Sequence, residues 1–298
     1  MLDALTARIA PSISSRASRY HWLWLLSRDS GAVLGSLTVV SMTLLGVFGP
    51  YFTGYDVLKV EPMKRLLPPS SSYLLGTDGF GRDMLTRMCF GARISLLVGL
   101  ATTICSTMLG AIVGLVAGYF TRVDGPIMRV MDGLMAFPSI LLAIAIMASL
   151  GPRTENVIGA LTVVYLPRIA RLARGQVLVV RELPYVEAAL ASGASPWRII
   201  LHHILPNSVS PLIVQGSFTF AFAIIVEASL SYLGAGVPPE IPTWGNMVQE
   251  GVPLMAAAPW LSVFPGLAIA TTVLGLNLLG DGLRDCLDPR IQEERKAH

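Results

Sequence analysis

Histidine and cysteine, the side chains that most often bind metals or act as nucleophiles, are few and scattered in this sequence. The four histidines are His21, His202, His203 and His298, and the three cysteines are Cys89, Cys105 and Cys286. No two cysteines have the CxxC spacing, and no histidine lies at a metal-ligand spacing from a cysteine. The sequence therefore predicts no metal site, no disulfide framework and no catalytic histidine.

Phosphate chemistry would require a different signature. The pattern Gly-x-x-x-x-Gly-Lys-Ser/Thr, which holds nucleotide phosphates, is absent. The glycines from Gly76 to Gly81 do not have the spacing of a dinucleotide-binding loop. We therefore expect a chain that is not an enzyme, binds no cofactor and does not itself hydrolyse ATP.

One acidic residue, Glu227, lies within a long apolar stretch. An ionisable side chain at the centre of a membrane helix costs about 2.5–3.5 kcal/mol on insertion scales. Two interpretations are open: a role near a translocation path, or a position close to the outer interface with a hydrogen bond to Ser229 or Ser231.

The composition identifies the environment that must hold these residues. Charged residues make up 14% of the 298 positions, against about 25% in a typical soluble chain, and hydrophobic residues make up 53%. The mean hydropathy is +0.63. These values exclude a disordered chain and an ordinary water-soluble enzyme, and they predict a protein embedded in lipid.

Six apolar stretches are long enough, or nearly so, to cross a bilayer, which takes about 20 residues. The third is interrupted by Phe137-Pro138, and the fourth is short and ends with Arg168 and Arg171. The predicted spans are 32–52, 94–120, 131–150, 157–173, 208–233 and 260–283. The fold class is therefore an all-α membrane protein with six transmembrane helices.

Lysine and arginine, which favour the cytoplasmic side, indicate the orientation. If the N-terminus is cytoplasmic, 15 of the 22 lie inside, and the last outer loop, residues 234–259, has none. Both termini are thus predicted to be cytoplasmic. Residues 4–26 form either an amphipathic surface helix or a solvated tail, and the sequence favours neither.

The third inside loop is more than thirty residues long and reads as helix, turn, helix. Pro184 suits the first turn of a helix, and Gly193 suits a left-handed cap at its end. Ser195-Pro196 reads as the start of a second helix over 197–205, which Pro206 is predicted to close. This knob either docks into a groove of a partner protein or rests on the membrane surface.

The same loop carries a recognisable pattern. Glu187-Ala188-Ala189, Gly193 and the closing Leu205-Pro206 resemble the EAA loop of ABC-transporter permeases from binding-protein-dependent importers. His203 occupies a position where the general pattern has isoleucine. The segment 203–207 is nevertheless similar to the ending found in the dipeptide/oligopeptide branch.

Further segments resemble that branch in the same order along the chain, from about residue 27 to residue 290. They are 75–83, 118–120, 129–132, 137–138, 227–234, 242–245, 277–285 and 288–290. The chain is similar to the second of two non-identical permease subunits, the dipeptide-permease C type, of dipeptide, oligopeptide or nickel importers.

The resemblance implies a type I importer fold in which the EAA loop docks into a separate ATPase. Carried over, the coupling residues are Glu187, Ala188, Ala189 and Gly193, with Trp197 and Arg198 near the contact. The implied division is a cytoplasmic segment 1–30, a permease domain 31–290 with the coupling loop at about 182–207, and a cytoplasmic tail 291–298.

The implied partners are a homologous permease subunit forming a heterodimer, two ATP-binding subunits, an extracytoplasmic substrate-binding protein and the bilayer of a bacterial inner membrane, with no nucleic acid. ATP is used by the partner subunits. Di- or oligopeptides are the expected substrates, although branch members also carry nickel and other solutes. The alternative is a secondary transporter, which should show paired intramembrane ionisable residues and an inverted repeat.

Two smaller patterns concern packing. Gly110, Gly114 and Gly118 are spaced by four, which lets one face of the second span approach a neighbouring helix closely. Arg168, Arg171 and Arg174 recur every three residues. Two interpretations are open for these arginines. Their side chains snorkel toward the membrane interface, or they contact a partner or anionic headgroups.

Overall fold

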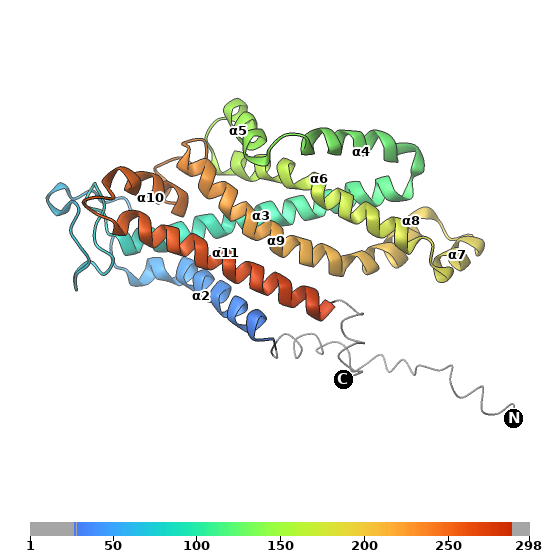
Figure 1. Ribbon diagram of the computed structural model, residues 1–298, viewed down its shortest axis with the longest axis horizontal. Coiled ribbons are helices and arrows are strands. Elements are labelled where there is room, and N and C mark those ends of the chain that lie inside the picture. Colours follow the sequence, from blue (N-terminus) through green and yellow to red (C-terminus); the bar gives the residue numbers. More distant parts are fainter. Residues whose placement is uncertain (1–26, 28, 288–298) are drawn as a thin grey trace, which may run out of the picture.

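The computed structural model describes residue 27 and residues 29–287, and within them the chain is built from helices (Figure 1). Among these described residues, five helices are long and apolar enough to cross a membrane. They are α2 (Ser30–Phe52), α3 (Met84–Tyr119), α6 (Thr154–Val180), α9 (Leu205–Tyr232) and α11 (Trp260–Leu287). The predictions for residues 4–26 and 291–298 lie outside the described residues.

Shorter helices connect the long ones. They are α4 (Thr121–Met135), α5 (Ser139–Leu150), α7 (Pro184–Ala191), α8 (Pro196–Ile199) and α10 (Trp244–Gly251), with single turns at Pro62–Lys64, Ile200–Ile204 and Val252–Leu254. Helices α7 and α8 lie at one end of the long axis, and α10 lies at the other beside the loop of residues 53–83 (Figure 1). We call these the α7 end and the α10 end.

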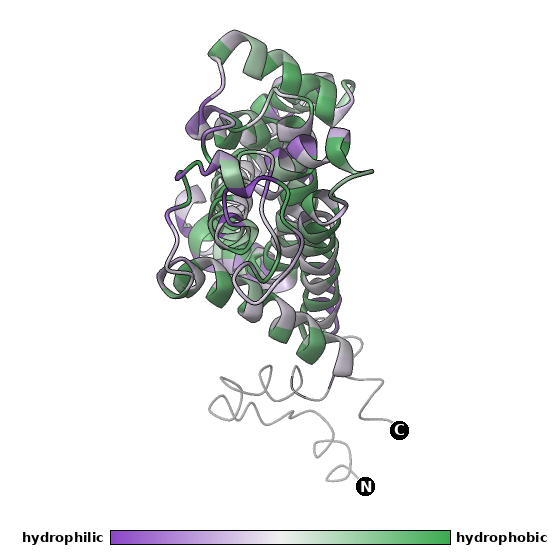
Figure 2. Cartoon of the chain, turned by 90° about the vertical axis from the view of Figure 1, so that its left-hand side faces the viewer, coloured by the Kyte–Doolittle hydropathy of each residue, from purple (hydrophilic) through white to green (hydrophobic). Residues whose placement is uncertain are grey.

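Helix α3 forms the centre of the bundle. It packs along α6, α9 and α2, and α11 packs against both α2 and α9. Viewed from the α10 end, hydrophilic residues are found mainly in the loops, where they alternate with apolar ones, while the outward helix surfaces are mainly hydrophobic (Figure 2). This is the distribution expected of helices that face lipid, with loops that face water.

The predicted interruption of the third apolar stretch at Phe137-Pro138 is confirmed, and it separates two helices, α4 and α5. Helices α4 and α5 meet at an angle of 93° at the segment around Phe137-Pro138. Proline has no N–H to continue the helix, and it disfavours helical backbone at the residue before it. Helix α5 has 12 residues, about 18 Å, so only the bent pair together has the length of a span.

Arginines of α6 hold α4 in place. Arg174 donates two hydrogen bonds to Asp124, at 2.5 and 2.6 Å, and Arg171 contacts Asp132 at 2.6 Å. Two of the three arginines in the predicted stripe therefore form ion pairs with a neighbouring helix of the same chain.

The glycine stripe of α3 packs on α6. A Cβ added to Gly114 would lie 2.2 Å from the carbonyl oxygen of Ala170, and one added to Gly118 would lie 2.7 Å from the Cβ of Val177. No side chain fits at this distance, so the two helices touch through their backbones. The stripe thus serves contact within the chain, as its spacing allowed.

Candidate coupling surface

Helix α7 begins and ends as the sequence predicts. Pro184 occupies the first turn, and Gly193 has φ +80° just after the helix. The N–H of Gly193 donates to the carbonyl of Leu190 at 2.9 Å, and the N–H of Ala194 donates to that of Ala189 at 3.1 Å. These two bonds form a Schellman cap, in which a glycine is strongly favoured because it adopts positive φ without strain.

Helix α8 also starts as predicted, since the Ser195 hydroxyl accepts the N–H of Arg198 at 3.4 Å. The prediction that Pro206 closes this helix is wrong. A π turn at Ile200–Ile204 leads directly into α9, and the N–H of Leu205 donates to the carbonyl of Ile200. The wider turn accommodates Pro206, which has no N–H, and α8 through α9 form one continuous span from Pro196 to Tyr232.

The inner side of this segment is firmly packed. Val186, Ile199, Ile200 and Ile204 are buried against Leu115 of α3 and against Val177 and Val180 of α6. Aromatic contacts add to this base: the rings of Phe120 and Trp197 lie 6.0 Å apart edge to face, and those of Tyr185 and His203 lie 5.9 Å apart.

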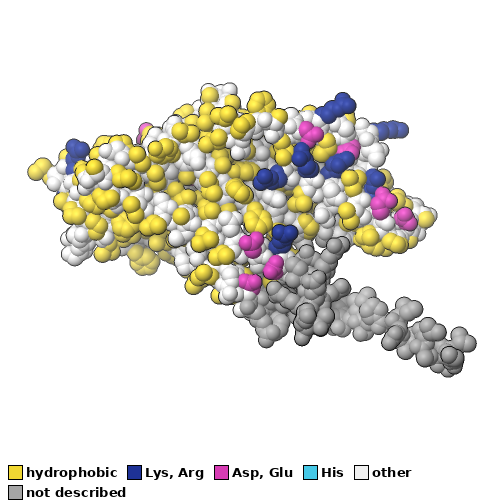
Figure 3. Space-filling view, in the orientation of Figure 1, with side chains coloured by type: hydrophobic (Ala, Val, Ile, Leu, Met, Phe, Trp, Pro, Cys, Tyr) yellow, Lys and Arg dark blue, Asp and Glu magenta, His cyan; other side chains and the backbone are white. Residues whose placement is uncertain are grey.

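The outer side is open and carries the predicted coupling residues. Glu187, Ala188, Gly193 and Arg198 are exposed, Ala189 is half-buried and Trp197 is 58% exposed. We call residues 184–199 the coupling knob. Charged side chains gather on the half of the molecule that carries the knob and α4 (Figure 3). The structure therefore brings the six predicted residues together on one protruding, chemically mixed surface.

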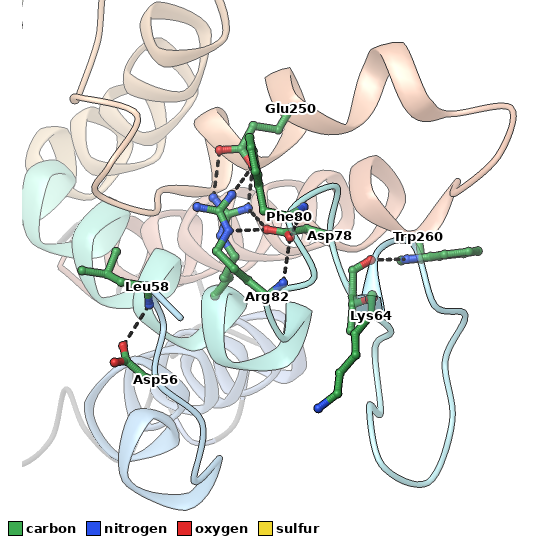
Figure 4. A network of polar contacts seen from close by, with 10 residues as sticks. Asp56, Leu58, Lys64, Asp78, Phe80, Arg82, Glu250 and Trp260 are labelled. Carbon is green, nitrogen blue, oxygen red and sulfur yellow. Dashed lines mark hydrogen bonds and ion pairs between the residues drawn. The ribbon is translucent and has the colours of Figure 1, made fainter. Parts of the chain in front are cut away.

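A second polar site, which the sequence analysis missed, lies at the α10 end (Figure 4). Arg87 donates to both carboxylate oxygens of Glu250, at 2.5 and 2.9 Å, and to Asp78 at 2.7 Å. Arg82 contacts Asp78 at 2.6 Å and Glu250 at 3.0 Å. These four residues, which we call the outer ion network, join the loop of residues 53–83 to α10.

The network is nearly excluded from solvent. The side chains of Arg87 and Asp78 are only 2% and 3% exposed. The Asp78 carboxylate also accepts hydrogen bonds from the N–H groups of Phe80 and Arg82, at 2.8 and 2.9 Å, and these bonds fold the backbone of residues 78–82 around it. One signal in the sequence was available: Asp78, Arg82, Asp83 and Arg87 recur at helical spacings beside the start of an apolar span.

The neighbouring acid Glu61 is partly exposed and pairs with two lysines instead of arginines. Hydrogen bonds from Lys59, at 2.8 Å, and from Lys64 lower the pKa of its carboxyl to about 2.

The Glu61 carbonyl lies against Gly81, where an added Cβ would be 2.0 Å from the oxygen, and Gly81 has φ +77°. Only glycine fits at position 81, where the backbone of the loop passes against the Glu61 carbonyl.

Glu227 is completely buried between α3, α9 and the start of α10. The hydroxyls of Ser231 and Ser95 donate to its carboxyl oxygens, at 2.8 and 3.2 Å. The same two hydroxyls accept the N–H groups of Val237 and Trp244, each at 3.3 Å. The predicted hydrogen bond to Ser231 is confirmed, whereas a role of Glu227 near a translocation path stays a prediction.

No metal site accompanies these groups in the described part of the chain, where histidine, cysteine and acidic side chains form no cluster able to hold an ion. The two outer segments, residues 53–83 and 234–259, cover this end of the bundle. Trp244, fully buried, donates its indole N–H to the carbonyl of Met88, and Trp260 donates to that of Thr77, both at 3.3 Å.

Comparison with known proteins places these features in one family. The family described as "Binding-protein-dependent transport system inner membrane component" matches residues 106–293, which include the coupling knob, α9 and α11.

Relatives of similar sequence cover nearly the whole chain. The dipeptide transport system permease protein DppC of Alkalihalophilus pseudofirmus is 43% identical over 90% of this chain and 88% of its own length. The probable D,D-dipeptide transport system permease protein DdpC of Escherichia coli is 39% identical over 97% and 98%. The glutathione transport system permease protein GsiD of Pectobacterium atrosepticum is 42% identical over 95% of each.

The fold has a counterpart among solved structures. A chain of the MetNI methionine ABC transporter, in an inward-facing form, superposes with a TM-score of 0.58 at 18% identity, covering 69% of this chain and 98% of that one. The helical bundle is thus that of an ABC importer permease. From the family match, the relatives and the fold together, this chain belongs to the family of inner membrane components of binding-protein-dependent transport systems.

Proposed function

We propose that this chain is one of two permease subunits of an ATP-driven importer of di- or oligopeptides in a bacterial inner membrane. The observation that carries the proposal is the coupling knob, whose inner side is packed on α3, α6 and α9 and whose outer side exposes Glu187, Ala188 and Gly193. The peptide class is supported by the dipeptide and glutathione permeases among the relatives.

The knob is mechanically connected to the span behind it. Because α8 continues through the π turn into α9, a movement of the knob is transmitted along one helical rod from Pro196 to Tyr232. The buried contacts of Val186 and Ile199 with the end of α6 couple the same movement to a second span. ATP hydrolysis by two separate ATP-binding subunits would thereby change the arrangement of the permease helices.

The exposed alanines of α7 indicate that the coupling knob docks into a groove of a partner protein and does not lie on the membrane surface. Small side chains let a partner approach the helix backbone closely, and Trp197 and Arg198 supply an aromatic and a charged contact at the edge. We infer that the other partners are a homologous permease subunit, in a heterodimer, and an extracytoplasmic binding protein that delivers the peptide.

The replacement Gly193→Glu tests the coupling role. A Cβ at Gly193 meets nothing within 4 Å, so the substitution leaves the packed base intact, but φ +80° strains any other residue by about 1–2 kcal/mol. We expect normal amounts of chain in the membrane, loss of ATP-dependent peptide uptake, and ATPase activity that no longer responds to substrate. Normal uptake by this variant would refute the coupling role.

A matched control uses the opposite end of the molecule. Met63 is 96% exposed at the α10 end, so Met63→Glu adds the same charge far from the knob and should leave substrate-dependent ATPase activity unchanged. Gly193→Asn provides a second comparison, because asparagine tolerates positive φ better than other residues and should retain part of the coupling.

The alternative of a secondary transporter makes a different prediction. A secondary transporter works without an ATPase, whereas the proposed importer subunit should retain ATP-binding subunits when the tagged chain is purified from membranes under gentle solubilisation. If no ATPase accompanies it and the chain alone moves solute in proteoliposomes, the proposal is wrong.

A further inference from the structure

Helix α9 has two open faces in the described structure, and their chemistry differs. One face forms a groove of about 840 Å³ with α3. Its lining is almost wholly apolar and includes Ile104, Met108 and Ile112 of α3 with Val209 and Ile213 of α9. Side chains of this kind suit the hydrocarbon of a bilayer.

The other face is polar. It forms a groove of about 760 Å³ between α6, α9 and the end of α11, a volume within the usual range of ligand sites. Amide, hydroxyl and guanidinium groups line it beside one aromatic ring: Gln176, Asn207, Ser210, Gln215, Phe218 and Arg284.

The same side of α9 continues toward the α10 end as a mainly apolar surface. Beyond Phe218, at spacings of three or four residues, come Phe222 and Ile225, which are 45% and 38% exposed. Ser229 and Tyr232 then line a smaller hollow of about 340 Å³ next to α10. Because residues three and four apart share one side of a helix, this is a single surface that follows the length of α9.

The polar part of this surface is unfavourable against lipid. Asn207 donates to the carbonyl of His203 at 2.6 Å and Gln215 donates to the Thr219 hydroxyl at 3.5 Å, but each carboxamide has further donor and acceptor capacity that hydrocarbon would leave unfilled. The glutamines and the asparagine on this face have no counterpart in the groove on the α3 side, and they therefore indicate which side of α9 meets water.

We propose that the α9 face from Asn207 to Tyr232 lines the solute path, and that Gln176 and Gln215 bind the main chain of the passing peptide. This inference rests on the function proposed above. A carboxamide both donates and accepts hydrogen bonds, so it matches the N–H and C=O groups of any peptide regardless of its side chains. Arg284, in the same groove, suits a peptide carboxylate.

This assignment moves the path away from Glu227, which was the sequence-based candidate. Glu227 is fully buried and is bonded to Ser95 of α3 and to Ser231, whereas the polar groove lies between α6 and α11. We therefore expect the groups that meet the peptide to be uncharged amides and hydroxyls, apart from Arg284.

Thiol accessibility in the assembled transporter tests the assignment. Cys105 is exposed and would be replaced by serine, while Cys89 and Cys286 are buried. A charged, membrane-impermeant thiol reagent should then modify Ser210→Cys and Gln215→Cys in inside-out vesicles. It should leave the matched variants Ile213→Cys and Met108→Cys, on the apolar face, at the background of the parent. Equal modification of both faces, or of the apolar face alone, would overturn the proposal.

Transport provides the second measurement. Gln215→Leu removes one neutral hydrogen bond of about 1 kcal/mol, so peptide uptake at low concentration should fall about fivefold with unchanged assembly. Ile213→Leu on the opposite face is the control. Unchanged uptake by Gln215→Leu would show that this amide does not contact the peptide.

The two proposals fail in different ways. ATP-dependent peptide uptake and a bound ATPase in the parent establish the proposed function independently of the groove. If these are present while Ser210→Cys and Gln215→Cys remain unmodified, only the assignment of the path is wrong. If the parent shows no such uptake, the proposed function itself fails.

Discussion

At the scale of single residues, the outer ion network shows how a membrane protein keeps charges in a nearly dry site. Two arginines face two carboxylates, so the four formal charges cancel, and every contact distance lies between 2.5 and 3.0 Å. In the described part of the chain, no disulfide bond joins the loop of residues 53–83 to α10. The outer ion network is therefore a principal attachment between them.

Removal of one member should be costly. Arg87→Met leaves Asp78 and Glu250 facing each other with Arg82 as their remaining partner, and breaking a buried pair in this way typically costs about 3–5 kcal/mol. We expect a clear drop in the melting temperature of the purified protein in detergent. Glu250 is partly exposed, which places the loss at the lower end of that range.

A double variant separates charge imbalance from lost packing. Arg87→Met combined with Glu250→Met removes one charge of each sign and should recover part of the stability lost by the single variant. Lys64→Met, at an exposed ion pair with Glu61, is the control and should have little effect, since surface pairs contribute about 0–1 kcal/mol. Equal stability of all three variants and the parent would contradict the role of the network.

The sequence indicates these residues only in part. The charges from Asp78 to Arg87 stand out beside an apolar span, but Glu250 lies more than 160 positions away and its pairing depends on how α10 folds back. The hydrogen bond to Glu227 was easier to predict, because Ser231 lies one helical turn further on and a serine at that spacing can donate to the carboxyl group.

At the scale of elements, local signals located the helix ends well. Proline, serine and glycine placed the boundaries of α7 and α8, since proline and glycine act through their own backbones and Ser195 caps its helix through its own hydroxyl. They failed at Pro206, where the π turn carries the helix onward. At Phe137-Pro138 they located the break between α4 and α5 but did not reveal its angle of 93°. Tertiary packing decides both outcomes.

The contact between α3 and α6 depends on the absence of side chains. Gly114→Ala places a methyl group 2.2 Å from the carbonyl oxygen of Ala170, so the helices must separate. We expect a loss of about 1–3 kcal/mol, the usual range for an overpacked core. Thermal unfolding in detergent would measure it.

Gly159 in α6 offers the matched control. It is exposed, and an added Cβ meets nothing within 4 Å. Gly159→Ala should be neutral or stabilise the helix by up to about 1 kcal/mol, because alanine is the better helix former. If both substitutions have the same effect, close packing of α3 on α6 is not what requires Gly114.

At the scale of the whole molecule, the distribution of arginine and lysine predicts which end faces the cytoplasm. With the knob inside, Met63 near the α10 end lies on the extracytoplasmic side of the membrane. In intact cells, an impermeant thiol reagent should therefore modify Met63→Cys. Ser192→Cys, which is exposed in the coupling knob, should react only after the membrane is opened. The reverse pattern would invert the proposed orientation and remove the knob from contact with ATP-binding subunits.

The right-angled break between α4 and α5 has a consequence for how the protein is inserted into the membrane during synthesis. Helix α5 is too short to be released into lipid as an independent segment, and α4 carries Asp124 and Asp132, whose arginine partners belong to α6. The ribosome makes α6 later, so Asp124 and Asp132 gain these arginine partners only after α4 and α5 have been synthesised. We therefore expect α4 and α5 to reach their final positions only when α6 packs against them.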